Sequence, residues 1–142
     1  GEVDGLTPKD IVLLIGTNNT VDHPDGTPPQ TPEQVTAGIE AVVHELHTRM
    51  PAAKITLIEI LPSAVSKDKS VKDAAVNTAI ATDYAQTLYI RLLDLAPLLM
   101  KDDTLDVSLF YDPRLPSHRP PLHPDTEAQR DMAAAVDAAL YP

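Results

Sequence analysis

The sequence has no cysteine, and this absence removes several kinds of chemistry at once. Without a thiol the chain can form no disulfide framework, no thiolate metal site and no cysteine nucleophile. Basic residues are also few, because 11 lysines and arginines stand against 21 aspartates and glutamates, giving a formal net charge of −10. Such a charge repels phosphate backbones and anionic bilayers. We therefore expect no nucleic-acid partner.

Long hydrophobic runs are missing as well. The apolar stretches at residues 11–15 and 92–100 fall far short of the roughly 20 residues that a helix needs to cross a bilayer, and Asp94 and Pro97 interrupt the second. We expect no membrane span. The chain starts at Gly1 without an initiator methionine or a basic-then-apolar leader, so the sequence leaves the cellular compartment open.

The order of the predicted elements is that of an α/β protein. With 142 residues, 43% of them hydrophobic, we expect residues 1–142 to form a single domain. The aliphatic run 11–15 is typical of a strand buried on both faces of a parallel sheet. Further strands are predicted at residues 54–60 and 88–93, and helices at 31–50, at about 70–87 and from about 125. Strands that alternate with helices indicate a parallel sheet.

Apolar residues at helical spacing predict which helix faces pack on the sheet. Residues 94–121 carry no strong periodicity, so we expect an irregular stretch there. The predicted buried faces are Val35, Ile39, Val42, Val43 and Leu46 on the first helix, Val71, Ala75, Val76, Ile80 and Tyr84 on the second, and Met132, Val136 and Leu140 on the last.

The first candidate site is Gly16-Thr17-Asn18-Asn19, directly after the first strand. In an open parallel sheet, ligands bind beyond the carboxyl ends of the strands. The glycine lets the backbone turn sharply, and an asparagine amide there can donate a hydrogen bond to a developing oxyanion without adding charge. Glycine and asparagine are equally ordinary in a turn that only closes a strand. The residues alone leave both interpretations open.

The second candidate site is His123, which stands between Leu122 and Pro124 just before the last predicted helix. A histidine held there can serve as general base toward a serine hydroxyl and then as acid toward the leaving group. Taken alone, a surface or capping histidine is the commoner case. His118 competes for the role, but no helix follows it. The other histidines, His23, His44 and His47, have no partners at metal-ligand spacing, and we expect no metal site.

These motifs resemble the SGNH (GDSL-like) hydrolase family. Residues 11–19 are similar to its third conserved block, Gly-x-Asn-Asp, and the Gly-Thr-Asn-Asn form is similar to the catalytic subunits of platelet-activating-factor acetylhydrolase. The resemblance continues at residues 38–39, 51–54, 60–62, 76–77 and 122–124. It implies a flavodoxin-like three-layer α/β/α fold with a parallel sheet. It also implies a serine esterase or acylhydrolase that acts without a cofactor on short acyl or acetyl esters, including esters of carbohydrate.

The resemblance also implies roles for individual residues. Asn18 corresponds to the oxyanion-hole asparagine in a substrate loop with Gly16 and Asn19, and His123 corresponds to the catalytic base. The family pattern Asp-x-x-His-Pro places an aspartate three residues before the histidine, where this chain has Pro120.

The orienting acid must therefore be found elsewhere. Phe110-Tyr111-Asp112 is similar to the family's Phe-x-Asp lead-in, which makes Asp112 the candidate acid and residues 113–121 a proline-rich insertion that would have to fold back. A backbone carbonyl that orients His123 in a Ser-His dyad is the alternative. Asp125 is better explained as a helix cap.

The nucleophile has no counterpart in the sequence. The family carries its serine in a Gly-Asp-Ser block, whereas the five serines here, Ser63, Ser66, Ser70, Ser108 and Ser117, lie in no such context. The resemblance implies the C-terminal portion of a domain whose N-terminal strands and serine lie on a segment or second chain outside this sequence. Residues 11–15 would then form an unpaired apolar edge, which predicts such a partner or self-association along the edge. A non-catalytic SGNH-like association module is the alternative function.

Overall fold

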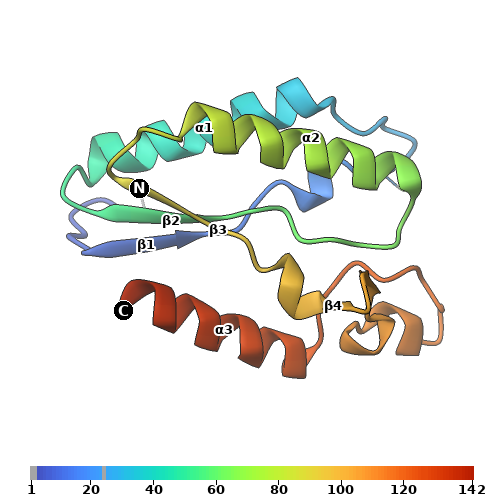
Figure 1. Cartoon of the computed structure of the whole chain (residues 1–142). Helices are drawn as coiled ribbons and strands as arrows, with labels where there is room; N and C mark the ends of the chain where they lie inside the picture. The colour runs from blue at the N-terminus through green and yellow to red at the C-terminus, as the bar shows by residue number, and fades with distance from the viewer. Residues whose placement is uncertain (1–2, 24) are drawn as a thin grey trace.

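The computed structural model describes residues 3–23 and 25–142. It is an α/β fold in which three parallel strands form a sheet in their chain order. Helices α1 and α2 lie on one side of the sheet and α3 lies on the other (Figure 1). The predicted alternation of strands and helices is thereby confirmed. The elements are β1 (Asp10–Leu13), α1 (Pro32–Arg49), β2 (Lys54–Ile58), α2 (Lys67–Asp83), β3 (Ile90–Leu93) and α3 (Thr126–Leu140).

The hydrophobic core has two parts, one on each side of the central strand β2. Ile55 and Leu57 are fully buried and pack with residues of α1 and α2. Ile58 belongs to the second part, which packs against Phe110 and Met132 on the α3 side. This separation follows from the alternation of side chains along a strand. The sheet thus offers a fixed base from which the loops at its carboxyl end project.

Strand β1 lies at the edge of the sheet and is less buried than the sequence predicts. Ile11 and Leu13 pack against the core under α1. Val12 and the following Leu14 are 44% and 41% exposed. The prediction of a strand buried on both faces is wrong for this chain, because among the described residues β1 pairs only with β2 and little covers its other side.

The second predicted helix and the third predicted strand differ from the structure at their ends. Helix α2 begins earlier than expected because the Ser66 hydroxyl accepts a hydrogen bond from the Lys69 amide and caps it. The helix ends at Asp83, and β3 begins only at Ile90. Val71, predicted to be buried, is 61% exposed. The buried stripe of α2 instead begins with polar residues, which an apolar pattern could not reveal.

Two further expectations concern the first helix and the stretch that follows β3. Helix α1 begins close to the predicted start at residue 31, where Thr31 and Gln34 form a capping box, although Val42 on that helix is exposed. The stretch predicted to be irregular contains short 3-10 turns (Ala96–Leu99, Val107–Leu109 and Asp112–Arg114) and a hairpin of β4 (Met100–Lys101) and β5 (Thr104–Leu105). No helix formed by the described residues is long and apolar enough to cross a membrane.

Candidate active site

The candidate acid and base predicted from the sequence lie in direct contact. The Asp112 carboxylate faces the ring of His123, with Asp112 Oδ1 at 3.1 Å from His123 Nδ1. Its other oxygen accepts backbone hydrogen bonds from His123 at 2.7 Å and from Leu122 at 3.0 Å. The Asp112 side chain is only 8% exposed, whereas that of His123 is 59% exposed. A buried carboxylate therefore holds one nitrogen of a ring that is itself largely exposed.

A folded-back loop brings the two residues together. Phe110, which is fully buried, forms an antiparallel bridge with Pro124. The Tyr111 amide donates to the His123 carbonyl at 3.0 Å, and the Asp125 amide donates to the Leu109 carbonyl at 2.8 Å. Residues 113–121 are thereby looped out between two paired segments. Asp112 and His123 are therefore in contact although the insertion separates them in the sequence.

The charge of Asp112 is stabilised by these contacts. Burial alone would raise the pKa of the Asp112 carboxyl, because burial disfavours the charged form. The amides of His123 and Leu122 and the His123 ring outweigh that effect and hold the pKa below its ordinary value. Asp112 therefore stays ionised beside the imidazole, as an orienting acid must.

Asp125 and His118, the alternative acid and base in the sequence, lie elsewhere. Asp125 caps α3 by accepting the amides of Glu127 and Ala128, and it forms an ion pair with Arg114. Its pKa is lowered, first by the Ala128 amide and then by Arg114. His118 is exposed in the looped-out insertion, where its Nδ1 lies 3.2 Å from the Pro113 carbonyl oxygen. Neither residue is hydrogen-bonded to His123.

The loop after β1 turns sharply at Gly16. This glycine has a φ of +107°, and a Cβ placed there would lie 2.9 Å from Ile60 Cδ1. Both observations require glycine, since a side chain would meet strain and a clash. The short 3-10 turn Thr17–Asn19 follows at the carboxyl end of the strand. Asn18 is exposed at its centre, and no hydrogen bond joins it to His123.

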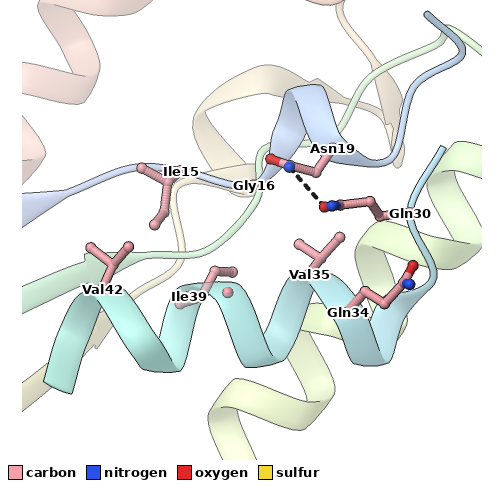
Figure 2. Close-up of a pocket in the computed structure, with 9 residues that line it drawn as sticks. Ile15, Gly16, Asn19, Gln30, Gln34, Val35, Ile39 and Val42 are labelled. Atoms are coloured by element: carbon pink, nitrogen blue, oxygen red, sulfur yellow. Dashed lines mark hydrogen bonds between the residues drawn. The ribbon is translucent and has the colours of Figure 1, made fainter. Parts of the chain in front are cut away.

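Asn19 has a role within the loop. Its side chain donates to Gln30 Oε1 at 2.8 Å, and its carbonyl accepts the Gln30 amide at 2.8 Å. These bonds tie the start of the long loop to its end. The same residues border a pocket of about 270 Å³ between the end of β1 and α1 (Figure 2). Its walls are mainly aliphatic, from Ile15, Gly16, Val35, Ile39 and Val42, and include neither His123 nor Asp112.

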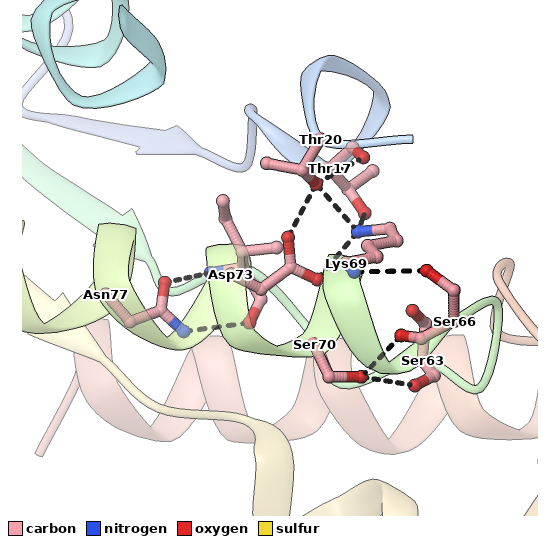
Figure 3. Close-up of polar contacts among 9 residues, drawn as sticks. Thr17, Thr20, Ser63, Ser66, Lys69, Ser70, Asp73 and Asn77 are labelled. Atoms are coloured by element: carbon pink, nitrogen blue, oxygen red, sulfur yellow. Dashed lines mark hydrogen bonds and ion pairs between the residues drawn. The ribbon is translucent and has the colours of Figure 1, made fainter. Parts of the chain in front are cut away.

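A buried polar cluster beside this turn was not predicted from the sequence. Lys69, 1% exposed, donates to Asp73, Thr20 and Thr17, and thus joins α2 to the loop after β1 (Figure 3). Asn77, two helical turns after Lys69, pairs its amide with both backbone groups of Ile60. A Lys–Asp pair four residues apart is ordinary on an exposed helix surface. Only the spacing of residues 69, 73 and 77 signalled a common face.

Three of the five serines serve other contacts. Ser66 caps α2, Ser70 donates to backbone carbonyls, and Ser108 donates to Asp106. The hydroxyl of Ser63 is buried without a partner in the described part of the chain. Among residues 3–23 and 25–142, no serine is hydrogen-bonded to His123, and no group of three His, Asp or Glu side chains is placed to hold a metal.

Comparisons with known proteins agree on the family. Residues 1–130 match the model of the GDSL-like Lipase/Acylhydrolase family. The chain is 35% identical over 96 residues to the platelet-activating factor acetylhydrolase IB subunit alpha2 of Rattus norvegicus, covering 67% of this chain and 38% of the relative. The Gallus gallus subunit is 31% identical over 114 residues, covering 79% and 46%. The chain thus spans less than half of these curated relatives.

A solved structure shows the same fold. A GDSL-like lipase from Bacteroides thetaiotaomicron superposes with a TM-score of 0.70 at 21% identity, covering 93% of this chain and 62% of that one. At this identity the likeness concerns the fold alone. Because the family model matches most of the sequence, the chain belongs to the GDSL-like lipase/acylhydrolase (SGNH) family.

Proposed function

We propose that this chain carries the acid, the base and an oxyanion donor of a serine ester hydrolase. His123 takes the proton from the serine hydroxyl and returns it to the leaving alcohol. Asp112 orients the imidazole and stabilises its charged form, and Asn18 donates to the oxyanion. The observation that carries the proposal is the buried Asp112 carboxylate, hydrogen-bonded at 3.1 Å to a ring that is 59% exposed.

The nucleophilic serine is proposed to come from polypeptide outside these 142 residues. Ser66, Ser70 and Ser108 have other contacts, and none of the five serines lies in a nucleophile motif. We place that polypeptide beside β1, where it would add strands to a flavodoxin-like sheet and complete the single domain to which residues 1–142 contribute. The exposed Val12 and Leu14 and the aliphatic pocket beside Ile15 favour this position.

The proposed substrates are esters of short acyl groups, including acetyl esters of carbohydrate. The mechanism requires no metal or organic cofactor, because the base, its orienting acid and the oxyanion donor are all side chains. Platelet-activating-factor acetylhydrolase subunits are among the relatives, which supports a small acyl group as the part that is transferred to the serine.

The second candidate function is a non-catalytic association module. The observation in its favour is the edge of β1, which has no strand partner among the described residues and is flanked by exposed Val12 and Leu14. An unpaired edge with apolar neighbours is a ready surface for another strand. The two functions differ in the role of His123, which the esterase requires for turnover and the association module does not.

The test is hydrolysis of p-nitrophenyl acetate combined with labelling by a fluorophosphonate probe, with mass spectrometry identifying the labelled polypeptide. The expected result is turnover with the label on a serine outside this chain, and loss of turnover in His123→Gln. The matched control is His118→Gln, in the exposed insertion, which should retain turnover. Label on a serine of this chain would contradict the location of the nucleophile. An inert protein without label would favour the association module.

A further inference from the structure

The structure assigns a positioning role to a buried network of Lys69, Asp73 and Thr20. We propose that this network fixes the turn Thr17–Asn19 and thereby sets the position of the Asn18 amide. The inference rests on the proposed function, since it concerns the oxyanion donor of that site. The inference gives residues of α2 a part in the proposed active site, although none of them touches the reacting atoms.

The network uses every hydrogen of the lysine. Lys69 Nζ lies 2.6 Å from Asp73 Oδ2, 3.0 Å from Thr20 Oγ1 and 3.2 Å from Thr17 Oγ1. An ammonium group has three hydrogens to donate, so each has an acceptor. The Thr20 hydroxyl in turn lies 2.6 Å from Asp73 Oδ1 and donates to it. Figure 3 shows these groups converging between α2 and the turn.

The stability of the fold does not by itself explain why these charged and polar side chains are buried. Lys69, Thr20 and Asp73 are 1%, 2% and 5% exposed. Taking a lysine and an aspartate out of water is costly, and well-packed apolar side chains of the same volume often stabilise a protein as well or better. An apolar pair could not, however, hold two threonine hydroxyls at fixed positions. What the charged pair adds is the geometry of the turn.

The turn depends on such outside support. It is a single 3-10 turn with one internal backbone bond, from the Asn19 amide to the Gly16 carbonyl. Asn18 itself is exposed and makes no hydrogen bond among the described residues. Of the residues around it, Thr17 and Thr20 are held by Lys69, and Asn19 is tied to Gln30. The position of the Asn18 amide is therefore set through them.

Lys69 is a positioning residue and not itself an oxyanion donor. Its three hydrogens are engaged, and its charge is balanced by Asp73 at 2.6 Å. In acyl transfer an oxyanion donor must meet two conditions: it lies roughly 2.7–3.1 Å from the developing charge, and it has a hydrogen free to donate. Asn18 meets the second condition, whereas Lys69 does not.

The test compares two substitutions at Thr20. Thr20→Val keeps the shape of the side chain and removes the hydroxyl that bridges Lys69 and Asp73, whereas Thr20→Ser keeps the hydroxyl. The kinetics are measured with p-nitrophenyl acetate on the esterase that contains this chain and its serine. We expect Thr20→Val to lower kcat about tenfold with little change in KM, because oxyanion contacts act mainly in the transition state. Thr20→Ser should restore kcat.

A second variant guards against simple misfolding. The double substitution Lys69→Met with Asp73→Leu removes both charges together, so that neither is left buried and unpaired. We expect it to fold, to lower kcat in the same way, and to speed amide hydrogen exchange at residues 17–20 of this chain. The matched control is Lys72→Met, which breaks the partly exposed Lys72–Asp68 pair on the same helix and should change neither quantity.

The outcomes separate this inference from the proposed function. If Asn18→Ala lowers kcat but Thr20→Val and the double variant do not, the positioning role is wrong and the esterase site stands. If Asn18→Ala leaves kcat unchanged, the oxyanion assignment fails. In that case hydrogen exchange still decides whether the network holds the turn. Unchanged exchange at residues 17–20 in both variants would overturn the inference.

Discussion

At the scale of single residues, Asp112 carries the strongest functional prediction. Asp112→Asn keeps the shape of the side chain but loses the charge that favours imidazolium at His123. We expect kcat for p-nitrophenyl acetate to fall by about a hundredfold or more, as for the orienting acids of other serine hydrolases. Asp106→Asn is the matched control, since that carboxylate binds only Ser108. Equal rates in the two variants would favour the dyad oriented by a backbone carbonyl.

The same carboxylate predicts how stability depends on pH. The folded protein holds the pKa of Asp112 below its ordinary value, through the amides of His123 and Leu122 against the opposing effect of burial. A depressed pKa contributes stability above the unfolded value, about 4 for aspartate, which is lost as pH falls through the folded value.

The unfolding free energies of the wild type and Asp112→Asn should therefore differ most near neutral pH. They should converge as the pH falls below the ordinary range of aspartate. Urea unfolding at a series of pH values measures this difference. A difference that widens toward low pH would contradict the assigned contacts.

Gly16 gives a prediction about backbone strain. A methyl group at this position meets Ile60 Cδ1 at 2.9 Å, on a backbone with a φ of +107°. Gly16→Ala should lower the free energy of unfolding by about 1–3 kcal/mol. Gly38→Ala is the control, because a Cβ at this position would meet nothing within 4 Å. Replacing a glycine within a helix by alanine raises the free energy of unfolding by about 0.5–1 kcal/mol. Opposite signs for the two variants in thermal unfolding are the expected result.

At the scale of elements, helix α2 organises the carboxyl end of the sheet. Lys69 and Asp73 hold the turn after β1, and Asn77 holds the end of β2 through Ile60. The side chain of Ile60 lies next to Gly16. One polar stripe on one helix therefore contacts both the loop that contains Gly16 and the residue, Ile60, that packs against Gly16.

Asn77 tests this role of α2. Asn77→Leu leaves the amide and the carbonyl of Ile60 without their partners, at 2.9 and 3.0 Å in the wild type. Unsatisfied buried groups destabilise a protein by about 1–3 kcal/mol, and we expect a loss of that size in urea unfolding. Thr78→Ala, the exposed neighbour whose hydroxyl bonds only to the Ala74 carbonyl, should change stability by less than about 0.5 kcal/mol.

The elements also show what could be predicted from the sequence. Strand β2, the start of α1 and the cap at Asp125 follow local rules, and those predictions are confirmed. The catalytic roles of Asn18, His123 and Asp112 stay predictions, although the structure places Asp112 against His123. The buried Lys69 could not be predicted, because its partners Thr17 and Thr20 lie about 50 residues away, and pairing over that distance is a tertiary property.

At the scale of the whole molecule, the edge of β1 is the feature that the described chain leaves uncovered. Val12 and Leu14 are exposed on one side of the strand. The aliphatic pocket beside Ile15 and Val42 lies on the other side. Apolar surface on both faces of an edge strand is what a sheet shows where further strands and helices belong. The net charge of −10 opposes non-specific association, so binding there should depend on the edge itself.

A charge placed at this edge tests the proposed partner surface. Val12→Lys puts an ammonium group on the α3-facing side of β1, and lysine on an edge strand is a common barrier to strand pairing. We expect the wild-type chain either to self-associate with rising concentration in light scattering or to capture a serine-bearing polypeptide, and Val12→Lys to do neither. Val71→Lys, at a more exposed valine on α2, should behave as the wild type. A wild-type chain that stays monomeric at high concentration and binds no such polypeptide would mean that the exposed edge is stable alone, and the proposed route by which the nucleophile reaches His123 would be wrong.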